Sequence, residues 1–124
     1  MTERTSAVLA RPDVRLWCLA LAQIPLAPML AQLSDAERQR ADRFRRSDDV
    51  ERFVKTRGAL RSILAACTGV RSLDLVESPG GKPQLRDNPH GLQFSVSHSG
   101  GYALIGVGWQ SLGVDIECVR RDLD

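Results

Sequence analysis

Two acidic residues near the end of the chain have the types and the spacing of a cation site. Asp115 and Glu117 lie in the run Gly113-Val-Asp-Ile-Glu117. In a β-strand, side chains two residues apart point to the same face, with their Cα atoms about 7 Å apart. Two carboxylates held side by side repel each other unless a positive charge lies between them. A hard cation that also binds phosphates is the natural candidate, and the alternative is a strand end whose acids face water.

Residues that could bind a phosphate-rich ligand come earlier in the chain. Lys82 follows two glycines and precedes a proline, so a turn presents one cation on a stiff backbone. The expected strand that follows ends in Ser97, His98 and Ser99. Together with the acid pair, the lysine and the Ser-His-Ser strand end indicate a site for a ligand rich in phosphate.

The Ser-His-Ser run has two other possible roles, as a core histidine with its neighbours or as part of a serine hydrolase site. His98 could be a core histidine, because strand alternation places it on one face with Phe94 and Val96. A serine hydrolase is not supported, because adjacent strand residues point to opposite faces and His98 cannot easily act as the base for Ser97 or Ser99. The chain also has no G-x-S-x-G nucleophile elbow.

Several motifs occur in a fixed order along the chain. They are Leu33-Ser34, Glu37-Arg38, Arg43-Phe44, Asp49, Arg52, Gly81-Lys82-Pro83, Phe94-Ser95-Val96-Ser97-His98-Ser99 and Gly113-Val114-Asp115-Ile116-Glu117. In this order the chain resembles the 4′-phosphopantetheinyl transferases of the large, two-lobed, surfactin-synthetase-activating type. The resemblance runs from about Trp17 to Glu117. The G-K-P, S-H-S and G-V-D-I-E elements are specific together and weak singly.

This resemblance implies an activity and a set of ligand contacts. Members of the family move the phosphopantetheine arm of coenzyme A onto a serine of an apo acyl or peptidyl carrier protein, with Mg²⁺. By resemblance, Asp115 and Glu117 would be the Mg²⁺ ligands. The residues implied to hold coenzyme A are Ser97 and His98 at its phosphates, and Arg40, Arg52 and Lys82 at its nucleotide end.

The chain departs from the family at its C-terminal end. The family's second lobe carries a W-x-x-K-E-x-x-x-K helix, and this chain ends at Asp124 without such a segment. We interpret residues 14–124 as the N-terminal lobe, after a flexible tail over 1–13, in either a cut fragment or a truncated gene product. Such a lobe is expected to be inactive alone and to form a homodimer that covers its open face. The alternative is a non-catalytic module that binds coenzyme A or a carrier protein.

Composition limits the remaining classes. The chain has 124 residues, 43% of them hydrophobic and 26% charged, with a net charge of +2, as in an ordinary globular domain. The segment 38–61 has nine Arg or Lys and four acids. Aromatic residues make up only 5% of the chain, so a nucleic-acid partner is not expected. The three cysteines have no C-x-x-C spacing, which favours reduced thiols in the cytoplasm. Prolines interrupt the apolar segment 16–33, so we expect no membrane segment.

The pattern of apolar residues predicts an α+β fold with two helices packed on one face of a mostly antiparallel sheet. A capping box at Ser34 and Glu37 begins the first helix, which should run to about Arg46. The second helix should end before Gly69. The expected helices are 34–46 and 48–67, a loop is expected around the prolines at 25 and 28, and the expected strands are 14–21, 73–77, 83–86, 94–97, 102–109 and 112–117.

Overall fold

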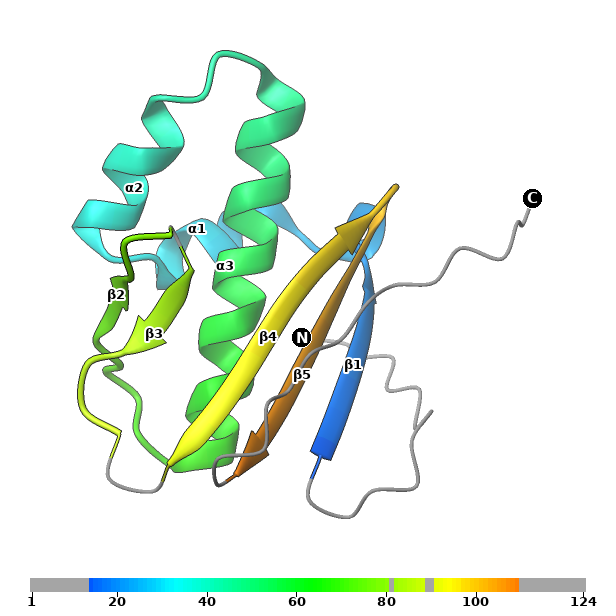
Figure 1. Cartoon of the computed structure of the whole chain (residues 1–124). Helices are drawn as coiled ribbons and strands as arrows, with labels where there is room; N and C mark the ends of the chain where they lie inside the picture. Colours follow the sequence, from blue (N-terminus) through cyan, green and yellow to red (C-terminus); the bar gives the residue numbers. More distant parts are fainter. Residues whose placement is uncertain (1–13, 81, 89–90, 110–124) are drawn as a thin grey trace. The chain divides into compact units, whose positions relative to one another are not determined.

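The computed structural model describes residues 14–80, 82–88 and 91–109 (Figure 1). The predictions that concern the tail 1–13, Gly81, His90 and the strand 112–117 lie outside these residues. The chain divides into two compact units, one formed by the described residues of Pro28–Pro89 and one by those before and after it.

The first unit is a three-stranded antiparallel sheet in the order β1-β5-β4. Its strands are β1 (Val14–Ala20), β4 (Leu92–Ser99) and β5 (Tyr102–Trp109), and a short 3-10 helix, η1 (Leu21–Gln23), follows β1. The two-residue turn between β4 and β5 begins with Gly100 at a φ of +60°, a backbone angle that side chains rarely allow. The central strand β5 pairs with β4, its partner in this hairpin, and with β1, which comes much earlier in the sequence.

The register of this sheet separates its two faces. Phe94 lies opposite Val107, and Val96 lies opposite Ile105, so these apolar residues share one face. His98 continues the same face at the end of β4, as the alternation predicts, and its side chain is exposed. Ser97 lies on the opposite face. The two neighbours therefore point apart, which agrees with the rejection of a Ser-His pair.

The second unit contains two longer helices and a small hairpin. The helices are α2 (Asp35–Asp42) and α3 (Ser47–Thr68), and the two-stranded hairpin joins β2 (Leu75–Glu77) to β3 (Pro83–Leu85). The capping box of α2 is present, since Glu37 N–H donates to Ser34 Oγ at 3.2 Å and Ser34 N–H donates to Glu37 Oε1 at 3.0 Å. Gly69 ends α3 in the left-handed conformation at a φ of +77°, as predicted.

A third helix, α1 (Leu26–Gln32), occupies the segment for which a loop was predicted. Pro28 lies in its first turn, where a backbone N–H has no partner within the helix and its loss costs little. Met29 packs against Gly58 of α3 so closely that a Cβ at Gly58 would lie 2.7 Å from the Met29 Cβ. Pro25 directly precedes α1 and Pro28 lies in its first turn, so these prolines mark the beginning of a helix and do not exclude one.

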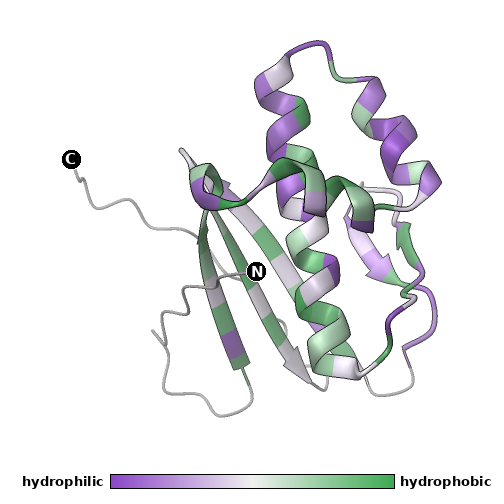
Figure 2. Cartoon of the chain, turned by 180° about the vertical axis from the view of Figure 1, so that it is seen from behind, coloured by the Kyte–Doolittle hydropathy of each residue, from purple (hydrophilic) through white to green (hydrophobic). Residues whose placement is uncertain are grey.

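The class α+β is confirmed, with three helices in the described parts where two were predicted, and with two separate sheets. Helix α2 ends at Asp42, earlier than predicted, and α2 is mostly hydrophilic in Figure 2. The described helices include none with the length and apolar character needed to cross a membrane.

Candidate functional site

A depression of about 460 Å³ lies within the unit formed by Pro28–Pro89, and we call it the arginine depression. Residues of α2, α3 and the β2–β3 region line it. Five arginines and three acids contribute to this lining. The lining residues are Ser34, Ala36, Glu37, Arg40, Arg43, Arg57, Arg61, Leu73, Asp74, Leu75, Val76, Glu77 and Arg86.

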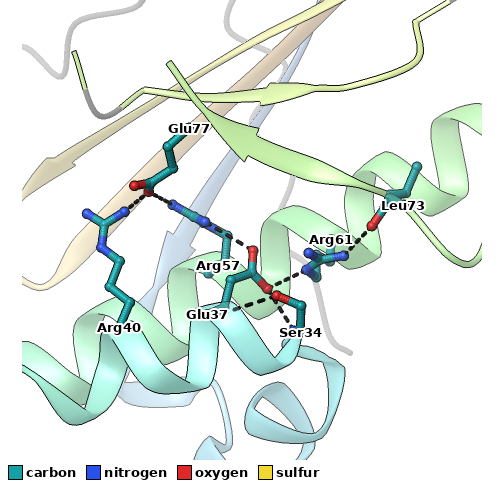
Figure 3. Close-up of polar contacts among 7 residues, drawn as sticks. All are labelled: Ser34, Glu37, Arg40, Arg57, Arg61, Leu73 and Glu77. Carbon is teal, nitrogen blue, oxygen red and sulfur yellow. Dashed lines mark hydrogen bonds and ion pairs between the residues drawn. The ribbon is translucent and has the colours of Figure 1, made fainter. Parts of the chain in front are cut away.

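Glu37 is the buried centre of the arginine depression (Figure 3). The residue is 5% exposed, and its carboxylate accepts hydrogen bonds from Arg61 Nε at 2.6 Å and from Arg57 Nη1 at 3.0 Å. Burial would raise the pKa of Glu37, but the hydrogen bonds from Arg61, the Ser34 amide and Arg57 hold that pKa below its ordinary value. The carboxylate therefore stays charged and bound on all sides.

Two arginines of α3 connect Glu37 to the rest of the unit. Arg61 Nη1 donates to the carbonyl oxygen of Leu73 at 2.8 Å, which joins α3 to the segment that leads into β2. Arg57 is 8% exposed, and burial together with the nearby Arg40 and Arg61 lowers its pKa, while Glu37 raises it. Arginine remains protonated at all physiological pH values, so Arg57 is a buried cation.

The outer end of the arginine depression carries a second carboxylate. Glu77, the last residue of β2, forms an ion pair with Arg40 of α2 and lies 3.6 Å from Arg57 Nη2. Both guanidiniums also lie over the Phe53 ring, with Cζ atoms 4.9 Å (Arg40) and 5.0 Å (Arg57) from its centroid, and Phe44 packs on the same ring. The Arg40 and Glu77 side chains are 37% and 39% exposed, although the paired Arg40 Nη1 atom is itself buried.

The other predicted contacts of this unit lie outside the lining of the depression. Arg52 lies on an exposed part of α3 and forms an ion pair with Asp49 at 3.4 Å. Lys82 directly precedes β3, is exposed, and accepts a backbone hydrogen bond from Ser78 N–H at 2.9 Å. Of the three basic residues implied by the resemblance, only Arg40 therefore lines the arginine depression.

The remaining predicted residues belong to the other unit or lie outside the described residues. Ser97 and His98 both lie on β4. The Ser97 hydroxyl is buried and has no hydrogen-bond partner within the part of the chain that the structure describes. Asp115 and Glu117 lie outside that part. Within 14–80, 82–88 and 91–109, no group of three His, Cys, Asp or Glu side chains could hold a metal ion.

Sequence reasoning missed the network of Glu37, Arg57, Arg61 and Glu77. It treated Glu37 as part of a helix cap, but Glu37 and Arg57 are buried. One signal was available. Arg57 and Arg61 are four residues apart and lie among the apolar positions of α3, so both point toward the interior. A pair of cations on an interior face requires a buried acid nearby.

Comparisons with known proteins agree with the motifs. Residues 17–109 match the family model described as 4′-phosphopantetheinyl transferase, N-terminal. The chain is 37% identical to the 4′-phosphopantetheinyl transferase HetI of Nostoc sp., over 90% of this chain and 50% of that protein. It is also 37% identical to a Synechocystis sp. protein provisionally named as a 4′-phosphopantetheinyl transferase, over 86% of this chain and 45% of that protein.

A solved structure has the same fold. It is a holo-(acyl-carrier-protein) synthase from Bacillus anthracis in complex with coenzyme A (3′,5′-ADP), with a TM-score of 0.60 and 22% identity. The match covers 81% of this chain and 96% of that one. The chain spans about half the length of the two curated relatives. Because the family model matches most of the sequence, the chain belongs to the 4′-phosphopantetheinyl transferase family, and the matched part is its N-terminal domain.

Proposed function

We propose that this chain is the N-terminal lobe, over residues 14–124, of a cytoplasmic enzyme that transfers the 4′-phosphopantetheine arm of coenzyme A to a serine of an apo carrier protein. The observation that carries the proposal is the match of residues 17–109 to the N-terminal domain of the family. The names of the two relatives and of the coenzyme A complex support the same activity. The carrier would be an acyl or a peptidyl carrier protein.

The basic residues of the lobe would bind the donor. Arg40 has a guanidinium at the rim of the arginine depression, and Arg52 and Lys82 are exposed cations of the same unit. A guanidinium binds phosphate through two parallel hydrogen bonds, and an ammonium binds it as a point charge. We propose that these three residues hold the nucleotide end of coenzyme A. The exposed His98 would contact its phosphates, and Ser97, whose hydroxyl is buried on the other face of β4, is implied there by the family resemblance alone.

Asp115 and Glu117 would hold Mg²⁺, since carboxylate oxygens are ligands that this ion prefers. When bound, Mg²⁺ would neutralise charge on the pyrophosphate of coenzyme A. In the reaction, the carrier serine oxygen bonds to the phosphorus that carries the pantetheine arm. The bond from that phosphorus to the oxygen that bridges the two phosphorus atoms breaks. 3′,5′-ADP then leaves with that oxygen, and the serine proton is released. The basic residues of this lobe would hold the donor in place for this exchange.

A test of the proposal uses the purified chain with coenzyme A, Mg²⁺ and an apo carrier protein. Because the chain spans about half of its relatives, we expect binding of coenzyme A without transfer. Calorimetry should show weaker binding of 3′,5′-ADP to Arg40→Ala than to Arg38→Ala, a control on the exposed side of the same helix. Equal binding by the two variants would remove Arg40 from the nucleotide contact.

A second candidate is a non-catalytic module that binds coenzyme A or a carrier protein. The same assay separates the two functions when the chain is compared with a longer protein that includes the remaining half. Transfer by the longer protein identifies the chain as an enzyme lobe. Binding without transfer in both proteins identifies a module.

We also propose that the isolated chain forms a homodimer. Leu30 of α1 is 39% exposed, and a second copy could cover this large apolar side chain. Sedimentation across a concentration series would show a monomer–dimer equilibrium. Leu30→Gln should shift that equilibrium toward the monomer, and a monomer at every concentration would refute the dimer.

A further inference from the structure

The carboxylate of Glu77 occupies the position next to Arg40 in which an anion would bind. Glu77 forms an ion pair with Arg40 and also lies 3.6 Å from Arg57 Nη2 (Figure 3). Both guanidiniums lie over the ring of Phe53, which limits where they can point. Two guanidiniums directed at one oxygen of a carboxylate form the kind of site that also binds a phosphoryl group.

The other acids that line the arginine depression already have partners. Glu37 accepts hydrogen bonds from Arg57 and Arg61 at 3.0 Å and 2.6 Å, and Asp74 accepts one from Arg86 Nε at 2.6 Å. Among the described residues, Glu77 is therefore the counter-ion of Arg40. If Glu77 moved away, Arg40 would keep its place on the Phe53 ring but would lose its negative partner.

The two ion pairs of this network, Glu37–Arg57 and Arg40–Glu77, differ in how far their side chains are exposed to solvent. Glu37 and Arg57 have side chains that are 6% and 10% exposed, so their pairing is part of the folded interior. Arg40 and Glu77 are 37% and 39% exposed. The Arg40 Nη1 atom is itself buried, but water reaches the rest of both side chains, so this pair is weaker than the one in the interior. The Arg40–Glu77 pair is therefore the part of the network that an incoming anion can open without unfolding the unit.

We propose that Glu77 is an internal counter-ion that competes with the phosphoryl group of the ligand for Arg40. This inference rests on the proposed role of Arg40 in nucleotide binding and adds a regulator of that contact. A carboxylate carries one negative charge, whereas a phosphate monoester carries nearly two at neutral pH and has three acceptor oxygens. A phosphate monoester or pyrophosphate therefore displaces Glu77, whereas a singly charged anion gains little over it. Glu77 thus lowers affinity for phosphoryl ligands in general and favours those with the highest charge.

The test compares four forms of the full chain in calorimetric titrations with 3′,5′-ADP and with inorganic pyrophosphate. They are the unchanged chain, Glu77→Gln, Arg40→Ala and the double variant. Glu51→Gln is the control, because it removes the same charge from an exposed acid whose partner is Lys55 at 3.4 Å. We expect Glu77→Gln to bind both probes about twofold to fivefold more tightly than the Glu51→Gln control, the range set by the strength of exposed ion pairs.

The double variant locates the effect. If Glu77 acts through Arg40, the gain in affinity disappears when Arg40→Ala is combined with Glu77→Gln. Glu77→Asp, which keeps the charge on a shorter side chain, should give an intermediate gain. If Glu77→Gln is too unstable to be titrated, as a lowered melting temperature would show, Glu77→Asp provides the test in its place.

Failure of the inference is distinguishable from failure of the proposed function. If Arg40→Ala weakens binding but Glu77→Gln binds no more tightly than Glu51→Gln, Glu77 is not a competitor and the role of Arg40 stands. If Arg40→Ala binds 3′,5′-ADP as tightly as the unchanged chain, Arg40 is not a nucleotide contact and the inference falls with it. The same double failure follows if neither probe binds to any form.

Discussion

Removing the Glu37 carboxylate should be among the most damaging single substitutions in this chain. Glu37→Ala deletes the acceptor for Arg57 and Arg61 and one half of the α2 capping box. Arg57 is only 8% exposed, so the substitution leaves a buried guanidinium without its main carboxylate. Breaking a buried ion pair by removing one partner costs about 3 to 5 kcal/mol. The whole free energy of unfolding of a domain is about 5 to 15 kcal/mol.

Urea unfolding measures this loss directly. With a dependence on urea of about 2 kcal/mol per molar, the midpoint should fall by roughly 2 M without a change in slope. Glu37→Gln keeps the shape and one acceptor oxygen but not the charge, so its loss should be smaller. Asp35→Ala removes an exposed acid from the same helical turn and should cost less than about 1 kcal/mol.

A loss below about 1 kcal/mol for Glu37→Ala would refute this reasoning. It would mean that the guanidiniums of Arg57 and Arg61 reach water or Glu77 when Glu37 is absent. The network would then be an open surface cluster. A loss equal to that of Asp35→Ala would assign the whole effect to the helix terminus, because both acids lie in the first turn of α2.

Three further outcomes are expected. The pKa of Glu37 is lowered in the folded chain, so its carboxylate stabilises the fold fully above the ordinary carboxyl pKa of about 4 to 4.5. This stabilisation is lost as the pH falls through the lowered, folded pKa. The difference in the free energy of unfolding between Glu37→Ala and the unchanged chain should therefore close in acid, as acid unfolding curves would show. Gly58→Ala should lower the free energy of unfolding by about 1 to 3 kcal/mol despite its better helix propensity, because its Cβ would lie 2.8 Å from the Met29 carbonyl oxygen, and unchanged urea unfolding would contradict this close contact. In the longer protein, Asp115→Ala should keep the melting temperature and abolish Mg²⁺-dependent transfer, and a near-normal transfer rate would remove Asp115 from the metal site.

The parts of the fold that were predictable depend on short-range interactions. The capping box at Ser34 and Glu37 links residues three apart, so the sequence alone shows both partners. Gly69 is predictable as a helix end because few other residues adopt its backbone angle. The bounds of β5 agree with the strand predicted from its run of apolar residues at 102–109. Helix α1 was missed because Pro28 marks either a loop or a first helical turn, and local sequence does not distinguish the two.

The site was only partly predictable, because its contacts are non-local. Arg57 and Glu37 are twenty residues apart and meet only when α2 and α3 pack against each other. Arg40 could be named from the family motif, but its pairing with Glu77 depends on where the β2–β3 hairpin lies. Hydrophobic periodicity reports which side of a helix is buried, but it does not report which charged groups face each other there.

The two acids of the arginine depression have different roles because they differ in burial. At Glu37, the carboxylate, Arg57 and Arg61 are all largely removed from water, so the pairing is strong in context and its loss disturbs the fold. At Glu77, both side chains are more than a third exposed, so the pairing is weaker than at Glu37, although the Arg40 Nη1 atom is itself buried. Arg57 touches both carboxylates, and its fixed pairing with Glu37 keeps a cation beneath the exposed pair. If Arg40 binds a phosphoryl ligand as proposed, the Phe53 ring would hold its guanidinium in place and Glu77 would be its replaceable partner.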